Sequence, residues 1–207
     1  MSSLSDDVAA TLDVSSETIE RLQIYVDVLQ KWQTKINLVA SSTIPHIWDR
    51  HILDSGQLKL FVPGWEKASW IDLGSGGGFP GMVMGILRPS EAPPIRLVES
   101  NRKKTLFLRD VSRETNANVE ILNCRIEELD GLQADIVSAR ACADLTKLLS
   151  WAEPLLSSGG HCVFHKGQYV DDELTEAHKY WRMKVTKRAS LTHQHGNLLL
   201  IGEIERV

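Results

Sequence analysis

The chain has 207 residues, 43% hydrophobic and 24% charged, which is the composition of a globular protein. No stretch approaches the ~20 consecutive apolar residues of a membrane helix, and the N-terminus lacks the basic start and apolar run of a signal peptide, so we expect a cytoplasmic protein without membrane contact. The net charge of −4 argues against a protein that holds nucleic acid by overall charge alone. The three cysteines, Cys124, Cys142 and Cys162, show no CxxC spacing, so we expect neither a disulfide framework nor a metal site.

The N-terminal part of the chain predicts one long amphipathic helix. Residues 1–14 are polar, and we expect them to be frayed. Ser15 and Ser16 then offer a helix cap, and Glu17 places an acid in the first turn. Apolar residues recur from there at helical spacing, which predicts a helix over 16–36 that packs on the main domain.

A second helix is expected to begin at Pro45, which suits the first turn of a helix. It carries the sequence Arg50-His51-Ile52-Leu53-Asp54-Ser55. Arg50 and Asp54 are four residues apart and His51 and Asp54 are three apart, so all three side chains share one face. Two interpretations stay open: a polar cluster that caps a ligand pocket or contacts substrate, and an exposed ion pair worth ~0.5 kcal/mol or less.

The remainder of the chain alternates strands and helices. Pro63-Gly64 breaks the chain, so we divide it into a helical extension over 1–64 and an α/β domain over 65–207. Strands are expected at 70–73, 95–99, 119–122, 134–138, 161–165, 183–190 and 197–206, and helices at 101–116, 144–157 and 171–181, with another between the first two strands. This order predicts a doubly wound, mostly parallel, seven-stranded sheet that ends in a β-hairpin.

The segment Ser69–Gly81 organises the α/β part of the chain. A short apolar strand enters a turn with five glycines in eight positions, and an apolar helix follows at once. Such a turn presents backbone N–H groups to a ligand. The chain entropy that five glycines cost argues against a turn that binds nothing.

Two ligand classes fit this turn. Gly76-x-Gly78-x-x-Gly81, with Glu99 near the place of the acidic residue, matches the dinucleotide fingerprint. Asp72-x-Gly74-x-Gly76-x-Gly78 matches the opening motif of methyltransferases that use S-adenosylmethionine. A carboxylate at the strand end disfavours a pyrophosphate, whereas it favours the sulfonium and ammonium groups of that methyl donor. We therefore favour the methyl donor and keep a nicotinamide-dependent oxidoreductase as an alternative.

Further candidate residues follow the other strands, because ligands of doubly wound sheets bind beyond the carboxyl ends of the strands. Glu99 follows the second strand, where a carboxylate can accept both hydroxyls of an adenosine ribose. The segment 123–127 follows the third strand and either flanks an adenine ring or simply forms a helix-entry turn. Arg140 and Lys166 follow the fourth and fifth strands, and together with Arg125 they predict a basic set near the pocket. We interpret the outer basic runs on 102–109 and 179–188 as solvated surface.

The fourth strand end is where a transferred methyl group should face its acceptor. An Asn/Asp-Pro-Pro-aromatic loop, typical of methylation of amino groups, is absent there. Methylation of a pyrimidine at C5 needs a thiolate, but Cys142 lacks a preceding proline and is interpreted as a small buried residue. Attack by a lone pair that bears no proton, as on guanine N7, needs no general base, only an acceptor about 3–3.5 Å from the methyl carbon. The residues leave this choice open.

At this point the sequence resembles a known family, RsmG, formerly called GidB. The motifs that carry the resemblance are Trp32-x-x-x-x-Asn37-Leu38, Arg50-His51-Ile52-Leu53-Asp54-Ser55, Asp72-x-Gly74-Ser75-Gly76-Gly77-Gly78-Phe79-Pro80-Gly81, Glu99-Ser100-x-x-Lys103-Lys104-x-x-Phe107-Leu108, Arg125-Ile126-Glu127-Glu128, Ser138-Ala139-Arg140-Ala141 and Lys166-Gly167. They occur in the family's order over about residues 20–170, and the last 40 residues add little.

The resemblance implies a class I methyltransferase fold and methylation of N7 of the guanine numbered 527, in the 530 loop of 16S ribosomal RNA, with S-adenosylmethionine as donor and no metal. The donor contacts that it implies fall on Gly74, Phe79, Ile126, Glu127 and Arg140, with Glu99 as the ribose carboxylate. The basic residues that it implies for the active site are Arg125, Arg140 and Lys166.

The hypothesis is therefore in-line methyl transfer to guanine N7 by a monomer that acts on 16S ribosomal RNA within the small subunit or an assembly intermediate. Asp72, Gly74, Gly76 and Gly78 would hold the amino-acid end of the donor. Besides the nicotinamide-dependent oxidoreductase, a non-catalytic RNA-binding module that kept a donor-binding fold remains a rival.

Overall fold

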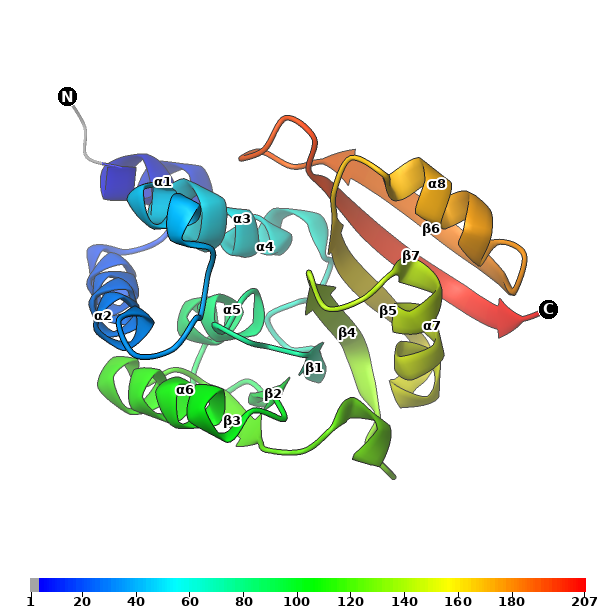
Figure 1. The fold of residues 1–207 in the computed structure, drawn as a ribbon, viewed down its shortest axis with the longest axis horizontal. Coiled ribbons are helices and arrows are strands. Elements are labelled where there is room, and N and C mark those ends of the chain that lie inside the picture. Colours follow the sequence, from blue (N-terminus) through cyan, green and yellow to red (C-terminus); the bar gives the residue numbers. More distant parts are fainter. Residues whose placement is uncertain (1–3) are drawn as a thin grey trace.

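Seven strands form one sheet in the order β3-β2-β1-β4-β5-β7-β6 in the computed structural model, which describes residues 4–207 (Figure 1). The strands are β1 (Trp70–Leu73), β2 (Ile95–Val98), β3 (Val119–Leu122), β4 (Ala134–Arg140), β5 (Leu156–Lys166), β6 (Trp181–Ala189) and β7 (Asn197–Arg206). Strands β1 to β5 pair in parallel, and β7 is antiparallel to both β5 and β6. The predicted doubly wound sheet with a terminal hairpin is confirmed.

Helices cover both faces of the sheet. They are α1 (Leu4–Leu12), α2 (Ser16–Gln33), α3 (Asp54–Gly56), α4 (Leu58–Phe61), α5 (Gly81–Leu87), α6 (Arg102–Thr115), α7 (Leu145–Ala152) and α8 (Val170–Ala177). Four shorter segments are the 3₁₀ turns η1 (Ser41–His46), η3 (Ile126–Glu128) and η4 (Glu153–Leu155), and the π-helical turn η2 (Trp48–Leu53). Helices α5 and α6 lie on one face and α7 and α8 on the other (Figure 1). All four residues of β1 are buried, as expected for a central parallel strand covered on both faces.

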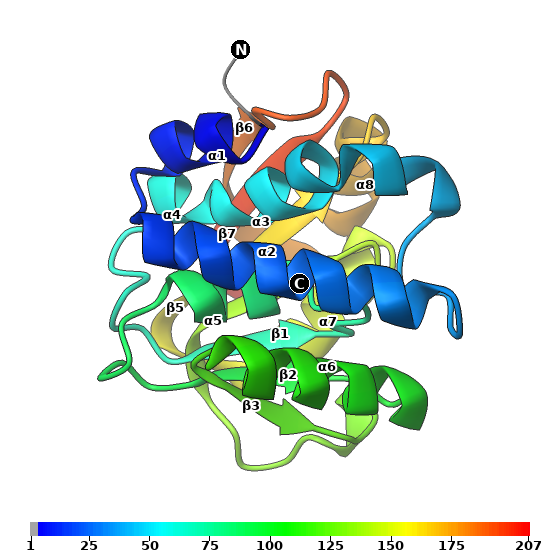
Figure 2. The ribbon, with the colours of Figure 1, turned by 90° about the vertical axis from the view of Figure 1, so that its left-hand side faces the viewer.

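The N-terminal helices share one apolar core with the sheet. Figure 2 shows α2 running across the molecule between α3 and α6. Buried Leu22 and Leu29 of α2 belong to the same apolar cluster as Trp70 of β1 and Phe107 of α6. The indole N–H of Trp32 reaches across to Asp110 of α6, at 3.1 Å. The predicted packing of this helix on the main domain is therefore confirmed.

Two predictions about the N-terminal part were wrong. Residues 4–12, expected to be frayed, form helix α1, because Val8 and Leu12 lie four residues apart on one face and are both fully buried; residues 1–3 lie outside the described part. The helix expected from Pro45 onward instead begins as the 3₁₀ turn η1, with Pro45 inside it, and continues as the π-helical turn η2.

In the C-terminal half of the chain, several element boundaries differ from the predicted ones. Helix α7 ends at Ala152 rather than near 157, and β5 already starts at Leu156 rather than 161. Gly159 and Gly160, expected to turn the chain into a strand, lie inside β5, where its pairing with β4 is irregular between Ala134 and Ile136. Strand β6 begins at Trp181, two residues earlier than expected.

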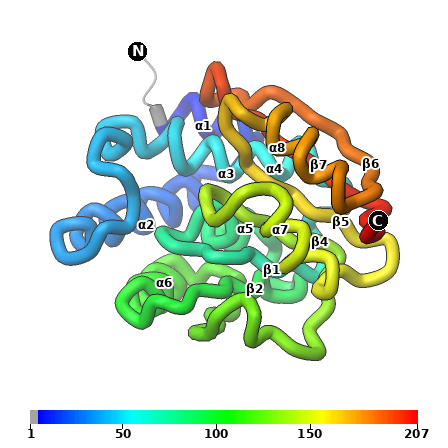
Figure 3. Tube along the Cα trace, turned by 45° about the vertical axis from the view of Figure 1, so that its right-hand side comes forward, coloured from blue at the N-terminus to red at the C-terminus, as the bar shows by residue number. Residues whose placement is uncertain are grey.

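The loop between β6 and β7 returns to the N-terminal helices. Figures 1 and 3 show this loop beside α1 and α3, far from the chain end at the other side of the hairpin. Two contacts fix it there: the Leu191 N–H donates to the side-chain oxygen of Gln57 at 2.9 Å, and the Gln57 amide donates to Ser190 Oγ at 3.1 Å. Along residues 4–207, no helix combines the length and apolar character needed to cross a bilayer. The fold thus brings the 190–196 loop, the 41–57 segment and the carboxyl ends of β1, β4 and β5 to one place.

Candidate active site

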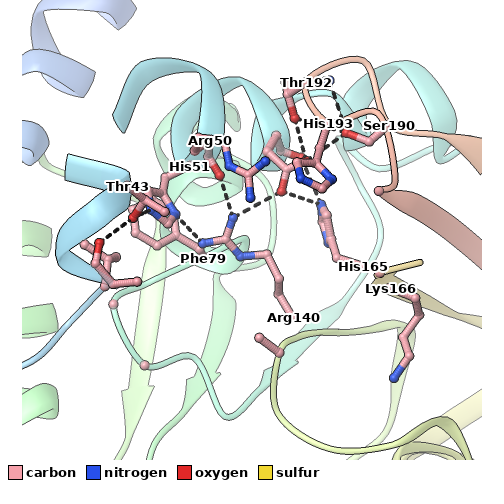
Figure 4. Close-up of a pocket in the computed structure, with 18 of the residues that line it drawn as sticks. Thr43, Arg50, His51, Phe79, Arg140, His165, Lys166, Ser190, Thr192 and His193 are labelled. Atoms are coloured by element: carbon pink, nitrogen blue, oxygen red, sulfur yellow. Dashed lines mark hydrogen bonds and ion pairs between the residues drawn. The ribbon is translucent and has the colours of Figure 1, made fainter. Parts of the chain in front are cut away.

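Two adjoining cavities lie beyond the carboxyl ends of the strands. The larger, of about 660 Å³, is lined by the glycine turn, by the 38–54 segment, by the ends of β4 and β5 and by the 190–197 loop (Figure 4). The smaller, of about 280 Å³, is lined by residues that follow β2, β3 and β4, including Glu99, Ile126 and Glu127. Gly74 lines both cavities, so one extended ligand can pass from one to the other across the end of β1.

Most N–H groups of the glycine turn already donate hydrogen bonds to acceptors within the protein. Gly74 has φ +63° and Gly78 has φ +90°, conformations that favour glycine. Gly76 N–H donates to Glu99 Oε2 at 2.9 Å, Gly78 N–H to Ser75 O at 2.6 Å, and the Ser75 N–H to Val98 O at 3.0 Å. A pyrophosphate is normally held by such N–H groups. Because these donors already have protein acceptors and a carboxylate stands among them, the turn is a poor dinucleotide site.

Asp72 lies beneath the glycine turn rather than on a cavity wall. Its side chain is completely buried, and Ser138 Oγ donates to Oδ1 at 2.6 Å. Its other oxygen, Oδ2, has no hydrogen-bond partner among the described residues. Burial raises the pKa of Asp72 to about 6, and the Ser138 hydroxyl opposes that rise. A carboxylate with an unsatisfied buried oxygen and a raised pKa is suited to a nearby cation.

The smaller cavity combines carboxylates with an apolar wall. Glu99 is held by two backbone groups, since its Oε1 accepts from the Asn101 N–H at 2.7 Å and its Oε2 accepts from Gly76. Val98, Ile126 and Trp151 supply the apolar wall. Each carboxylate oxygen can accept a further hydrogen bond. The cavity can therefore take a flat aromatic ring with a hydroxylated sugar beside it.

Cys142 differs from its expected place. The sequence predicts a small buried residue, but Cys142 is half-buried and lines the smaller cavity. A Cβ atom on Gly74 would lie 2.5 Å from Cys142 Sγ, so the thiol packs directly against the glycine turn. Burial, followed by the charges of Asp72, Glu99 and Glu127, raises the pKa of this thiol. Cys142 is thus protonated at neutral pH and is not an activated nucleophile.

Arg140 is held firmly on the wall of the larger cavity. Its guanidinium donates to Asp54 Oδ2 and to the Arg50 carbonyl, both at 3.1 Å, and to His51 Nδ1 at 2.6 Å (Figure 4). It also lies over the ring of Phe79, 4.8 Å from its centroid. Burial lowers the pKa of Arg140, and Asp54 opposes that change. His51 and Asp54 therefore belong to a largely buried polar cluster in which Asp54 pairs with Arg140 and not with Arg50, so the alternative interpretation as an exposed ion pair was wrong.

His51 is neutral in this cluster. Burial, followed by the charge of Arg140, lowers the pKa of His51 to about 3. An arginine can only donate, so His51 Nδ1 is the acceptor and the proton sits on Nε2, which donates to Thr43 Oγ1 at 2.8 Å. Its ring also stacks on Phe79, with 4.8 Å between ring centroids.

The Asp54 carboxylate connects its own segment to the end of β4 and to the β6–β7 loop. Its Oδ1 accepts from the Gln57 amide at 2.9 Å, from Ser190 Oγ at 3.0 Å and from Thr192 Oγ1 at 2.9 Å, while its Oδ2 accepts from Arg140. Burial alone would raise its pKa, but His165, Arg140 and the two hydroxyls together lower the pKa of Asp54 below its ordinary value. Asp54 is therefore ionised at neutral pH and serves as the common acceptor of the cluster.

The three predicted basic residues occupy different positions. Arg140 and Lys166 line the larger cavity, whereas Arg125 lines the smaller one. Lys166 is buried, and its Nζ lies 2.6 Å from Glu173 Oε2 and donates to Ala143 O at 3.0 Å.

Most of the outer basic run on β6 is exposed and paired with acids, in agreement with the predicted solvated surface, whereas Arg188 lies over the ring of Phe61. Its ion pairs join Arg182 to Glu205, Lys184 to Glu203 and Lys187 to Asp171.

Several cavity residues carry no signal in the sequence. Ser190, Thr192 and His193 lie in a polar loop near the end of the chain, a part that adds little to the family resemblance. Tyr25 of α2 is fully buried, and its hydroxyl donates to the Gly77 carbonyl, so a core helix supports the glycine turn. His165 precedes the predicted Lys166 and donates from Nε2 to the Asp54 carbonyl at 2.8 Å. Contacts between segments this far apart leave no periodic pattern.

Comparison with known proteins identifies the family of the chain. The family described as "rRNA small subunit methyltransferase G" matches residues 18–201. The chain belongs to this family. Ribosomal RNA small subunit methyltransferase G of Paramagnetospirillum magneticum is 47% identical over 194 residues, covering 93% of this chain and 92% of the relative. The protein of the same name from Rhodospirillum rubrum is 46% identical over 198 residues, covering 96% of each.

More distant proteins of known structure share the fold of this chain. Ribosomal protein L11 methylase from Lactobacillus delbrueckii subsp. bulgaricus aligns with a TM-score of 0.59 at 12% identity, covering 72% of this chain and 76% of that one. TrmN from Thermus thermophilus aligns with a TM-score of 0.58 at 14% identity, covering 75% of this chain and 49% of that one. The predicted resemblance and the predicted class I methyltransferase fold are both confirmed.

Proposed function

We propose that this protein transfers a methyl group from S-adenosylmethionine to N7 of a guanine in 16S ribosomal RNA, the guanine numbered 527 in the 530 loop. Membership of the methyltransferase G family supports donor-dependent methylation of ribosomal RNA. The observation that carries the proposal is the pair of cavities that meet at Gly74, with carboxylates around the junction and turn N–H groups already in use. That chemistry suits a donor with cationic groups and no phosphate.

The residues present fit the methyl donor. In the proposal, Glu99 accepts the ribose hydroxyls, while Ile126 and Glu127 flank the adenine in the smaller cavity. The glycine turn, with Gly74, Gly76 and Gly78, shapes the passage to the larger cavity. When bound, S-adenosylmethionine supplies a methyl group on a sulfonium centre.

Asp72, Phe79 and Arg140 would act around the amino-acid end of the donor. Asp72 favours a nearby ammonium group through its charge, acting from beneath the turn rather than by lining the cavity. Arg140 covers Phe79 and fixes the position of that ring, which lines the larger cavity. Asp72 and Arg140 are therefore positioning residues for the amino-acid end of the donor in this proposal.

The acceptor side of the proposal requires orientation and no proton transfer. Guanine N7 attacks with a lone pair that bears no proton, so the reaction needs the acceptor held in line with the methyl group. Two of the candidate bases or nucleophiles at the cavities are unsuited to that role, because both nitrogens of neutral His51 are hydrogen-bonded and the Cys142 thiol has a raised pKa. Arg140, Lys166 and Arg125 would supply positive potential around the junction. This arrangement supplies the orientation and the positive potential that the proposed attack by N7 requires.

The partner in the proposal is folded ribosomal RNA within the small subunit or an assembly intermediate, bound by a monomer. The net charge of −4 and the paired cations of β6 support recognition of a folded surface over uniform attraction to phosphate. Equally steep salt dependence on unstructured RNA and on subunits would contradict this part of the proposal.

The proposal is tested with methyl-labelled donor and small subunits that lack the modification. Borohydride and aniline treatment cleaves RNA at 7-methylguanine, so a single cut in the 530 loop would establish reaction, atom and site together. Label elsewhere would contradict the proposed nucleotide, and donor binding without any label would favour the non-catalytic module.

Calorimetry tests the donor site separately. Glu99→Gln should weaken donor binding about tenfold or more, because it removes a charged acceptor from the ribose site. The matched control is Glu120→Gln on β3, where the carboxylate is exposed and pairs with Arg96 at 3.2 Å, and it should leave donor binding unchanged. Tight binding of NAD with no binding of S-adenosylmethionine would overturn the proposal.

A further inference from the structure

Four arginine and lysine side chains line the larger cavity: Arg50, Lys104, Arg140 and Lys166. Two of them are committed to the protein itself. Arg140 is held by Asp54, His51 and the Arg50 carbonyl, and Lys166 by Glu173 and the Ala143 carbonyl. An incoming anion would have to compete with these acceptors, so neither cation is well placed to bind one.

The Arg50 guanidinium has no hydrogen-bond or ion-pair partner among residues 4–207. Figure 4 shows it among the side chains of the larger cavity, with a dashed line to its carbonyl and none to its guanidinium. Its backbone is fixed, because Arg50 lies on the π-helical turn η2 and its carbonyl accepts from Arg140. π-Helical turns are frequent at functional sites. A half-buried guanidinium on a fixed backbone, with all five donors unused, is suited to an anionic ligand.

Arg50 and Lys104 belong to different sides of the cavity. Lys104 lies in the first turn of α6, whose cap Asn101 is bound to Glu99, and Glu99 in turn holds Gly76. Arg50 lies one turn before Asp54, which is bound to Ser190 and Thr192 of the β6–β7 loop. Lys104 is therefore next to the proposed donor, whereas Arg50 lies on the side that remains for the acceptor.

We propose that Arg50 binds a phosphate of the RNA beside the target guanine, and that Arg140 acts as the positioning residue that fixes Arg50 and His51 in place. This inference rests on the proposed function and names the residue that contacts the acceptor strand. The planar fork of a guanidinium binds two phosphate oxygens at once, which orients the nucleotide as well as attracting it. A lysine would keep the charge but lose that geometry.

The test measures initial rates against concentration of unmodified small subunits for wild type, Arg50→Gln, Arg50→Lys and the control Arg182→Gln. Arg182 is an exposed cation on β6, paired with Glu205 at 3.4 Å and outside both cavities. We expect Arg50→Gln to raise KM for the subunit about tenfold, to change kcat less than about twofold and to leave donor affinity by calorimetry unchanged. Loss of one phosphate contact should also lower the slope of log KM against log salt by about 0.7–0.9. Arg50→Lys should recover most of the salt slope and only part of KM, and Arg182→Gln should match wild type.

Other outcomes would distinguish failure of the proposed role of Arg50 from failure of the proposed function. Unchanged KM and salt slope in Arg50→Gln, with wild type active, would overturn the role of Arg50 and leave the proposed function intact. Weaker donor binding would show that Arg50 binds the donor's carboxylate instead, which also overturns the proposal. If wild type methylates no RNA, the proposed function fails, and retention of labelled 16S ribosomal RNA on filters by wild type and Arg50→Gln then decides whether Arg50 binds phosphate. Circular dichroism and thermal unfolding confirm that each variant is folded.

Discussion

Replacing Asp54 with alanine removes the acceptor that joins Arg140 to the β6–β7 loop. The Arg140 and Asp54 side chains are only 16% and 15% exposed, so the substitution leaves a largely buried cation without its carboxylate. Breaking such a pair costs about 3–5 kcal/mol. Gln57, Ser190 and Thr192 also lose an acceptor, at about 1 kcal/mol each where water does not replace it. We therefore expect Asp54→Ala to lower the free energy of unfolding by about 4 kcal/mol or more, out of a typical total of ~5–15 kcal/mol.

Urea unfolding at pH 7, followed by circular dichroism, measures this loss. A double-mutant cycle with Arg140→Met isolates the coupling between the two side chains, which should be about 2 kcal/mol or more. The control is Glu205→Ala, whose partner Arg182 is 78% exposed, and it should change stability by less than ~1 kcal/mol. A loss of less than about 1 kcal/mol for Asp54→Ala would refute the reasoning, because the cluster would then not depend on the carboxylate.

Three further predictions concern other parts of the site. As the pH falls from 6.5 to about 3, the wild type should lose up to about 1.4 kcal/mol of stability per pH unit relative to His51→Asn, because only the unfolded histidine takes up a proton when the folded pKa is about 3. Parallel curves of unfolding free energy against pH for the two proteins would contradict this. Gly78→Ala should destabilise by about 2–3 kcal/mol in thermal unfolding, since φ is +90° and a Cβ would lie 2.5 Å from the Tyr25 hydroxyl and 2.8 Å from Met82 Cβ; an unchanged Tm would show that the turn can relax. Asp72→Asn should keep or raise stability at pH 7, because burial raises the pKa of this carboxyl to about 6, and should weaken donor binding in calorimetry about tenfold; a stability loss above ~2 kcal/mol would show that the fold needs the charge.

The strand ends show how far local sequence reaches. Apolar runs bounded by turn residues placed β1 to β4 within a residue or two, because a buried parallel strand must be apolar along its length. Once the strand order follows from alternation with helices, the residues after each strand must gather at one edge of the sheet. For this reason Asp72, Glu99, Arg140 and Lys166 could be expected near one another before their contacts were known.

The state of each of these side chains was not predictable in this way. Asp72 lies beneath the turn, where the hydroxyl of Ser138, 66 residues away, donates a hydrogen bond to its carboxylate. Lys166 forms an ion pair with Glu173, and Arg140 forms one with Asp54, which lies 86 residues before it. Burial and pairing are set by which segments meet in space, so the sequence predicted Arg140 and Lys166 near the pocket but not the acceptors that hold them.

The sequence by itself determined the fold class, the glycine turn and the edge of the sheet where ligands bind, because each depends on residue patterns that repeat or follow one another over a few positions. Only the tertiary structure decided that residues 4–12 form a packed helix, that His51 is neutral and that the 190–192 loop joins the cavity through Asp54. These features depend on contacts between segments as far apart as 138 residues, such as that between Asp54 and Thr192. A side chain's charge and partner follow from the packing of the whole chain, and no local pattern records them.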